Sequence, residues 1–396
     1  MYTDLKNLLD GLMERQLEEN TFVGASLYIL KNGKQIYRNN FGMADKARAV
    51  PVRDDTIFRL YSMTKPITAA AAMILYDRGR LHLDDPVSWF IKGFDEPKVY
   101  HGDKLVPAKR QIKIRDLFTM TSGLVYPDAG TPAGDAMSEL FDGFYKGAYA
   151  GKAMSTLEMC EEIGKRPLCC DPGELWNYGT SADVLAGVVE AISGKRYGQF
   201  LEDEIFKPLG MTDTDFYVPE EKRGRFAEIY IRNDRGELVP CDWQHLGLVY
   251  KYTKRPEFEI GGAGLVSTAD DYAKFASMLL DGGKYGKTRI LSENAVRLIT
   301  SNHLTEGQKV SFNWDSCRGY GYGGLMRVLK DPWEAGAGVV GEYGWDGWTG
   351  NYFCNDPLNR LTFLYFIQVC GGNGERPIRT LKQAVYSAID DDPYPF

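Results

Sequence analysis

The sequence predicts an α+β fold in which both ends of the chain share one antiparallel sheet and a mainly helical domain is inserted between them. A strand-like hairpin pattern lies within the first 60 residues and further strand-like patterns lie in the last third of the chain, while helical patterns dominate the middle. An N-terminal hairpin joins C-terminal strands in one sheet only when the intervening chain forms its own unit. We therefore expect a sheet domain at 1–58 and 262–396, a helical domain at 59–261, and a functional cleft at their junction.

The first elements are a helix and a hairpin. Residues 5–13 carry leucine and methionine at helical spacing, which is typical of an amphipathic helix. Two apolar runs rich in β-forming residues follow, Gly24–Leu30 and Lys34–Phe41. Asn32-Gly33 between them is a strong hairpin signal, so we predict two antiparallel strands.

A second, Ala-rich helix follows the hairpin. From Lys65 to Arg78 apolar side chains recur at helical spacing, which predicts a buried helix. Pro66 fits its first turn, where the backbone N–H groups lack intrahelical partners in any case. Ser62 stands just before this helix.

The middle of the chain reads as helices joined by loops. Residues 112–118 suggest a short strand that turns into a helix. Residues 126–151 are rich in Gly and Ala with weak periodicity, so we expect an irregular segment over a cleft that buries its aromatic side chains, Phe141, Phe144, Tyr145 and Tyr149. Further helices are predicted at Thr156–Arg166, Ser181–Ile192, Tyr197–Phe206, from Ser267/Thr268 to Leu280, and at Ile290–Ile299.

Short strands return toward the C-terminus. Residues 228–256 alternate around a turn signal, and the last third carries four strand-like runs with an Asp356-Pro357 turn before the last of them. The four runs are Tyr320–Val328, Val339–Tyr343, Tyr352–Asn355 and Leu361–Gln368. A helix at Pro377–Ile389 closes the chain.

Composition restricts the class of partner. A net charge of −7 without any basic run argues against nucleic acid or an anionic membrane. No apolar run reaches the ~18 residues of a membrane helix, and the N-terminus has no signal-peptide pattern. Seven cysteines without a Cys-x-x-Cys read as reduced thiols. We expect a cytoplasmic protein, and its oligomeric state is left open.

Ser62 and Lys65 are the strongest chemical signal. Of the fifteen serines, only Ser62 has a lysine three residues later, which places both side chains on one face of a helix start. The N–H groups there favour negative charge on an attacked substrate. A lysine in a dry cleft loses its proton more easily and activates the hydroxyl. This is the chemistry of a serine acyl-enzyme without histidine, although Ser-x-x-Lys alone is a common pattern.

Other hydrolase mechanisms lack their motifs. No serine stands in Gly-x-Ser-x-Gly, the nucleophile turn of α/β-hydrolases. The four histidines, at 82, 101, 245 and 303, lie in no context that suggests a triad. No His or carboxylate cluster has metal-ligand spacing, so we expect neither a metal nor a cofactor.

Tyr178 is the candidate partner that could stand in for histidine. It follows a Pro-Gly turn and Trp176 and immediately precedes the helix at 181–192, a corner where functional side chains are often presented. A neighbouring cation would have to depress its pKa. A core tyrosine that anchors the loop is the alternative.

Several motifs in order resemble the class C β-lactamase-like serine hydrolases. That superfamily includes penicillin-binding DD-peptidases, family VIII carboxylesterases and fungal acyltransferases, and its fold is the β-lactamase/transpeptidase-like α+β fold. The resemblance runs from about residue 24 to 368. It rests on Ser62-Met63-Thr64-Lys65, on Pro172-Gly173-Glu174-Leu175-Trp176-Asn177-Tyr178, on Pro208–Met211, and on Gly261–Thr268 with Asp271.

The resemblance implies a role for each matching residue. Ser62 corresponds to the acylated nucleophile, Lys65 to its activating partner, and Tyr178 to the residue that carries the proton to the leaving group. Trp345-Asp346-Gly347 falls where the third motif, Lys-Thr-Gly, would stand. The backbone N–H groups of Ser62 and Trp348 would then form the oxyanion hole. Trp348-Thr349-Gly350 is the competing alignment of this motif.

Two departures from β-lactamases point to the substrate. Thr180 replaces an asparagine that holds a β-lactam side chain, and Trp345 replaces the lysine that binds a substrate carboxylate. The aromatic residues expected near the cleft, Tyr126, Trp345, Trp348 and Tyr352, suit an uncharged acyl ester. We predict substrate-binding roles for Tyr126, Thr180, Trp345 and Gly347.

The resemblance therefore implies a carboxylesterase that acts on small or short-chain acyl esters. A β-lactamase or DD-peptidase and an acyltransferase with a second acceptor are the alternatives. A binding protein without catalysis on the same scaffold is less compatible with Ser62, Lys65 and Tyr178 all being present.

Overall fold

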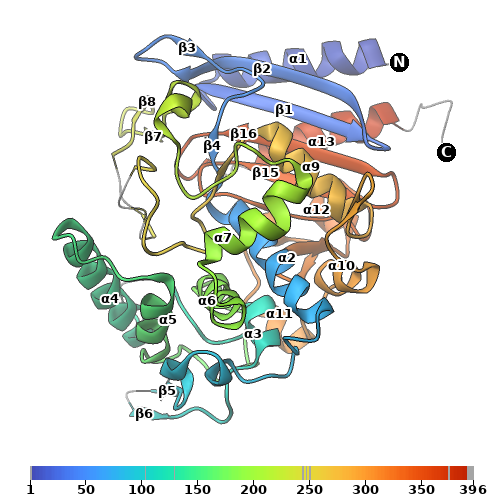
Figure 1. Ribbon diagram of the computed structural model, residues 1–396. Coiled ribbons are helices and arrows are strands. Elements are labelled where there is room, and N and C mark those ends of the chain that lie inside the picture. The colour runs from blue at the N-terminus through green and yellow to red at the C-terminus, as the bar shows by residue number, and fades with distance from the viewer. Residues whose placement is uncertain are drawn as a thin grey trace.

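The protein is an α+β structure built on one eight-stranded antiparallel sheet (Figure 1). The computed structural model describes residues 2–102, 104–128, 130–242, 245–246, 248, 251–372 and 375–389. Its sheet has the strand order β12-β13-β14-β15-β16-β1-β2-β3. The strands are β1 (Gly24–Lys31), β2 (Lys34–Asp45), β3 (Val50–Pro51), β12 (Tyr320–Tyr322), β13 (Arg327–Leu329), β14 (Tyr343–Asp346), β15 (Tyr352–Asp356) and β16 (Leu361–Ile367).

The pairing of β1 with β16 brings the two ends of the chain together. Ala25 lies opposite Ile367 and Lys31 opposite Leu361, so the N-terminal hairpin continues the C-terminal strands as predicted. The domain boundaries at 58/59 and 261/262 stay a prediction.

Alternating side chains give the sheet two apolar faces. Tyr352 and Cys354 of β15 point to the core under α1 (Tyr2–Glu18) and α13 (Glu375–Ile389). Phe353, between them, points to the larger core that contains α2 (Thr64–Asp77) and α9 (Ala269–Leu280). The sheet is therefore covered on both sides.

Of the remaining helices, α4 and α5 lie with the β5–β6 hairpin at the lower left of the view, far from α1, whereas α7 and α12 lie at mid-height (Figure 1). The helices are α3 (Ile114–Phe118), α4 (Pro132–Tyr149), α5 (Thr156–Gly164), α6 (Ser181–Ser193), α7 (Tyr197–Leu201), α8 (Lys207–Leu209), α10 (Glu293–Ile299), α11 (Glu306–Lys309) and α12 (Pro332–Ala335). The short strand pairs are β4 (Phe58–Arg59) with β9 (Val266–Ser267), β5 (Lys98–His101) with β6 (Lys104–Pro107), β7 (Tyr230–Arg232) with β8 (Leu238–Pro240), and β10 (Lys284–Tyr285) with β11 (Thr288–Arg289).

The prediction of an irregular segment at 126–151 was wrong. Thr131 caps α4 by accepting a hydrogen bond from the Gly134 N–H, and Pro132 occupies the first turn. Phe141 and Phe144 are buried, but Tyr149 is 63% exposed. The glycines weakened the helical pattern without breaking it, because one face still carries the apolar side chains.

The C-terminal strands also differ in detail from the prediction. Residues 320–328 form two strands, β12 and β13, joined by a turn instead of one long strand. The strand predicted at 339–343 starts only at Tyr343 and continues to Asp346. In the described part of the chain, none of the helices has both the length and the apolar character needed to span a bilayer.

Candidate active site

Ser62 lies on a 3₁₀ turn, Tyr61–Met63, that leads directly into α2. Tyr61 has a φ of 45°, a left-handed conformation that is strained for a bulky residue. The turn is held from both sides, since the Leu60 N–H donates to the Leu265 carbonyl at 2.9 Å and the Tyr272 hydroxyl donates to the Met63 carbonyl at 2.9 Å. These two contacts therefore fix the position of Ser62.

Lys65 is fully buried and points at Ser62 from the first turn of α2. Its Nζ lies 3.1 Å from Ser62 Oγ and 3.1 Å from the Tyr126 hydroxyl, and donates to the Gly262 carbonyl at 2.7 Å. Burial lowers the pKa of Lys65 to about 7, and the negative charge of Asp183 opposes this effect. Near neutral pH a substantial fraction of Lys65 is therefore an uncharged amine that can accept the Ser62 proton.

Asp183 was not identified from the sequence. It lies in the first turn of α6, is buried, and accepts a hydrogen bond from the Gly262 N–H at 2.7 Å. Its second oxygen has no hydrogen-bond partner among the described residues. Burial raises the pKa of Asp183, although Lys65 and the Gly262 N–H act in the opposite direction. Gly262 thus bridges the two side chains, because its N–H donates to the Asp183 carboxylate and its carbonyl accepts from the Lys65 amine.

These contacts predict the pH dependence of activity. Because a protonated Lys65 cannot accept the Ser62 proton, kcat/KM should fall as pH decreases through about 7. Asp183→Asn removes the charge that favours the ammonium form, so this acid limb should move to lower pH, by roughly one pH unit. The measurement is kcat/KM for a neutral ester between pH 5 and 9. An acid limb at the same pH in both proteins contradicts the assignment.

Tyr178 reaches Ser62 from the corner before α6. Its hydroxyl donates to Ser62 Oγ at 2.8 Å and accepts a hydrogen bond from Trp345 Nε1 at 3.2 Å. Lys65 Nζ lies 4.6 Å from the centre of its ring. Burial raises the pKa of Tyr178 despite these two hydrogen bonds, so the condition for Tyr178 to replace histidine as a base is not met. Tyr178 is therefore a neutral phenol at rest, and Lys65 is the group better suited to act as base.

The tryptophan beside Tyr178 is Trp345, on strand β14. Its ring centre lies 5.7 Å from that of Tyr178, and its side chain is buried. Thr349, in the competing alignment, instead hydrogen-bonds the Arg59 carbonyl at 3.4 Å. The geometry favours Trp345-Asp346-Gly347 as the third motif. Trp345 also supports the Tyr178 hydroxyl through its Nε1–H, and substrate binding by Trp345 stays a prediction.

Gly347 and Trp348 turn the chain toward Ser62. A Cβ on Gly347 would lie 2.3 Å from the Leu60 carbonyl oxygen, so this close approach requires glycine. The Trp348 ring packs 5.2 Å from Tyr61 and 4.3 Å from His245. Among the described residues, the Trp348 N–H donates to no backbone carbonyl. It is therefore available to a developing oxyanion.

The other two predicted site residues differ in their surroundings. Tyr126 is in contact with Lys65, and its ring packs edge-on against Tyr178 at 5.7 Å. Thr180 is fully buried at the N-cap of α6, and its hydroxyl has no hydrogen-bond partner in the part of the chain described. Substrate binding by Thr180 stays a prediction.

His245 and Trp314 also reach the site, and sequence analysis missed both. Burial lowers the pKa of His245 to about 4, so it is neutral at physiological pH. The Trp314 ring lies 4.9 Å from that of Tyr178. Neither residue belongs to a recognisable motif, so the sequence gives no signal for it. Only the tertiary structure brings both residues close to the site.

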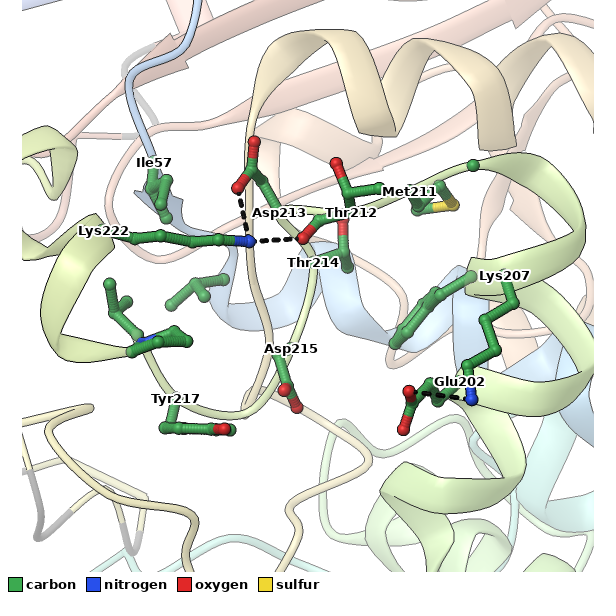
Figure 2. A pocket seen from close by; sticks show the side chains of 15 residues that line it. Ile57, Glu202, Lys207, Met211, Thr212, Asp213, Thr214, Asp215, Tyr217 and Lys222 are labelled. Atoms are coloured by element: carbon green, nitrogen blue, oxygen red, sulfur yellow. Dashed lines mark hydrogen bonds and ion pairs between the residues drawn. The ribbon is translucent and has the colours of Figure 1, made fainter.

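A cavity of about 390 Å³ lies elsewhere, beside α8 (Figure 2). Its lysines are paired within it, Lys222 with Asp213 at 2.9 Å and Lys207 with Glu202 at 3.0 Å. None of the predicted site residues lines this cavity. The cluster around Ser62 is the stronger candidate.

Comparisons with known proteins identify the family of the chain. A sequence model described as Beta-lactamase matches residues 9–387. Protein Rv1367c of Mycobacterium tuberculosis is 34% identical over 359 residues, which cover 88% of this chain and 86% of that protein. Esterase EstB of Burkholderia gladioli is 29% identical over 396 residues, 96% of this chain and 94% of its own length.

Solved structures give the same result. EstCE1, described as a hydrolase with promiscuous acyltransferase activity, superimposes with a TM-score of 0.81 at 26% identity and covers 97% of this chain and 99% of its own. Simvastatin synthase LovD of Aspergillus terreus has the same fold, with a TM-score of 0.81 at 23% identity over 97% of this chain and 98% of its own. The protein therefore belongs to the Beta-lactamase family of serine hydrolases, with the α+β fold predicted from its motifs.

Proposed function

We propose that this protein is a serine carboxylesterase that forms an acyl-enzyme at Ser62 and hydrolyses small, uncharged acyl esters. The observation that carries the proposal is the meeting of Lys65 Nζ and the Tyr178 hydroxyl at Ser62 Oγ, at 3.1 and 2.8 Å. A nucleophile within hydrogen-bond reach of both a base and a proton donor is the arrangement that acyl transfer requires.

Each group has one task in the proposed mechanism. Ser62 Oγ attacks the ester carbonyl carbon while its proton passes to uncharged Lys65, and the N–H groups of Ser62 and Trp348 stabilise the oxyanion. The bond to the alcohol then breaks as Tyr178 protonates the departing oxygen, and Lys65 returns its proton to Tyr178. Water attacks the acyl-enzyme by the reverse sequence of proton transfers and releases the carboxylic acid and free Ser62.

The surroundings of the third motif favour an uncharged substrate. In the alignment adopted for the third motif, Trp345 stands where β-lactamases carry a carboxylate-binding lysine, and its indole N–H donates to Tyr178. Arg327, a possible substitute, lies 5.5 Å from the centre of the Trp345 ring, but it is buried and its charge is already paired with Asp346 at 3.0 Å. The names of EstB and EstCE1, an esterase and a hydrolase, support the same reading.

Substrate charge provides the test of this reading. We expect kcat/KM for p-nitrophenyl butyrate to exceed that for nitrocefin, because the charge-assisted hydrogen bond to the β-lactam carboxylate is missing. Loss of such a bond lowers binding of the β-lactam, and with it kcat/KM, by roughly 10–100-fold. The measurement is the steady-state rate on both substrates. Mass spectrometry of penicillin-treated enzyme shows in addition whether a penicillin adduct forms. Equal or greater efficiency on nitrocefin would instead identify a β-lactamase.

An acyltransferase is the second candidate, favoured by the activity named for EstCE1. It differs only in the acceptor, since an alcohol replaces water in the second half of the reaction. Ester product formed in the presence of an added alcohol, measured against free acid, separates the two activities.

A further inference from the structure

Trp314 is an exposed tryptophan that contacts the proposed proton donor. Its side chain is 40% exposed, and its ring packs edge-on against Tyr178 at 4.9 Å and against Trp176 at 5.1 Å. Trp89 and Trp333 are more exposed, at 71% and 90%, and make no ring contact with a described residue. Trp314 therefore combines solvent exposure with contact to the reactive centre.

The chemistry of the leaving group places the alcohol on this side of Ser62. Tyr178 can protonate the departing oxygen only from about 2.6–3.2 Å. The carbon chain on that oxygen must then lie beside the Tyr178 ring, where Trp314 is the exposed neighbour. Trp348, which carries the proposed oxyanion N–H, contacts Tyr61 and His245 instead. The two tryptophans thus border different parts of the substrate.

The surface behind Trp314 is aromatic. Trp176 stacks on Tyr178 at 5.9 Å and meets Phe312 edge-on at 4.7 Å. Aromatic rings interact most favourably with a planar, apolar partner that can stack on them or meet them edge-on. A charged alcohol would lose its hydration at such an aromatic surface without gaining an ion pair or a hydrogen bond in return.

We propose that Trp314 binds the alcohol part of the ester and selects uncharged aromatic alcohols, benzylic or phenolic, as leaving groups. This inference rests on the proposed esterase function and adds the substrate class to it. The same surface receives an aromatic alcohol as acceptor when the reaction runs in reverse, because the acyl-enzyme is common to both directions.

The test compares benzyl butyrate with ethyl butyrate, whose alcohol carries no ring to pack against Trp314. Trp314→Ala should lower kcat/KM for benzyl butyrate by about 10-fold, mainly by raising KM. The same variant should keep kcat/KM for ethyl butyrate within about twofold of the wild-type value. Trp314→Phe, which retains a ring, should recover most of the loss. Trp333→Ala, at an exposed tryptophan without ring contacts, is the matched control and should change neither rate.

The alternative outcomes distinguish a failure of the Trp314 inference from a failure of the proposed esterase function. An equal fall on both esters makes Trp314 a structural support for Tyr178 and overturns the inference. Unchanged hydrolysis of benzyl butyrate by Trp314→Ala overturns it as well. A wild-type protein that hydrolyses neither ester overturns the esterase proposal itself, and with it this substrate class.

Discussion

Ser62→Ala will abolish ester hydrolysis while the protein stays folded. Ser62 Oγ is the only atom that both Lys65 and Tyr178 contact at hydrogen-bond distance in the described structure, so no other nucleophile is placed to replace it. The loss of a catalytic nucleophile lowers turnover by roughly 10⁴–10⁶-fold. Steady-state hydrolysis of p-nitrophenyl butyrate by purified variant measures it.

The control for this variant is Ser387→Ala. Ser387 lies exposed on α13, on the far side of the sheet from Ser62, so its replacement should leave turnover and thermal stability unchanged. A Ser62→Ala protein that retains more than a few per cent of wild-type turnover would show that the acyl-enzyme forms elsewhere or not at all.

Tyr178→Phe should lower turnover by about 10²–10⁴-fold, because the ring stays and only the proton donor is lost. The variant also loses the hydrogen bonds to Ser62 and Trp345, which should change the free energy of unfolding by no more than about 1–3 kcal/mol. Turnover and thermal unfolding, measured on the same preparation, separate the catalytic effect from the structural one.

Tyr322→Phe is the matched control for Tyr178→Phe. Tyr322 is buried and packs against Trp345 at 5.2 Å, but its hydroxyl has no hydrogen-bond partner among the described residues. Its removal should leave turnover within about twofold. If Tyr178→Phe instead unfolds easily while the folded fraction keeps normal turnover, Tyr178 is a core anchor and not a proton carrier.

The fold could be predicted from local signals wherever these agree with tertiary structure. Asn32-Gly33 marks the β1–β2 hairpin, and the apolar spacing after Lys65 marks α2. The helix within residues 126–151 could not be predicted because its glycines lower intrinsic helix propensity, whereas packing of Phe141 and Phe144 stabilises α4. Tertiary contacts outweighed local preference there.

The candidate site divides in the same way. Ser62 and Lys65 are three residues apart, so the geometry of a helix start already brings them together. Asp183 and Trp314 come from elements distant in sequence, and only the folded chain places them near Lys65 and Tyr178. For Tyr178 the sequence supplied only a condition, a pKa depressed by a neighbouring cation, and that condition is not met because burial raises the pKa, which a motif does not reveal.

The central claim is that acylation occurs on Ser62, and trapping the acyl group tests it most directly. The protein is incubated with a slowly deacylating ester or an alkyl fluorophosphonate, digested, and mapped by tandem mass spectrometry. The account predicts one adduct, on the Ser62 side chain, that is absent from Ser62→Ala and forms more slowly below about pH 7, where Lys65 is protonated. An adduct on a cysteine or another serine, at a rate that matches turnover, would contradict it.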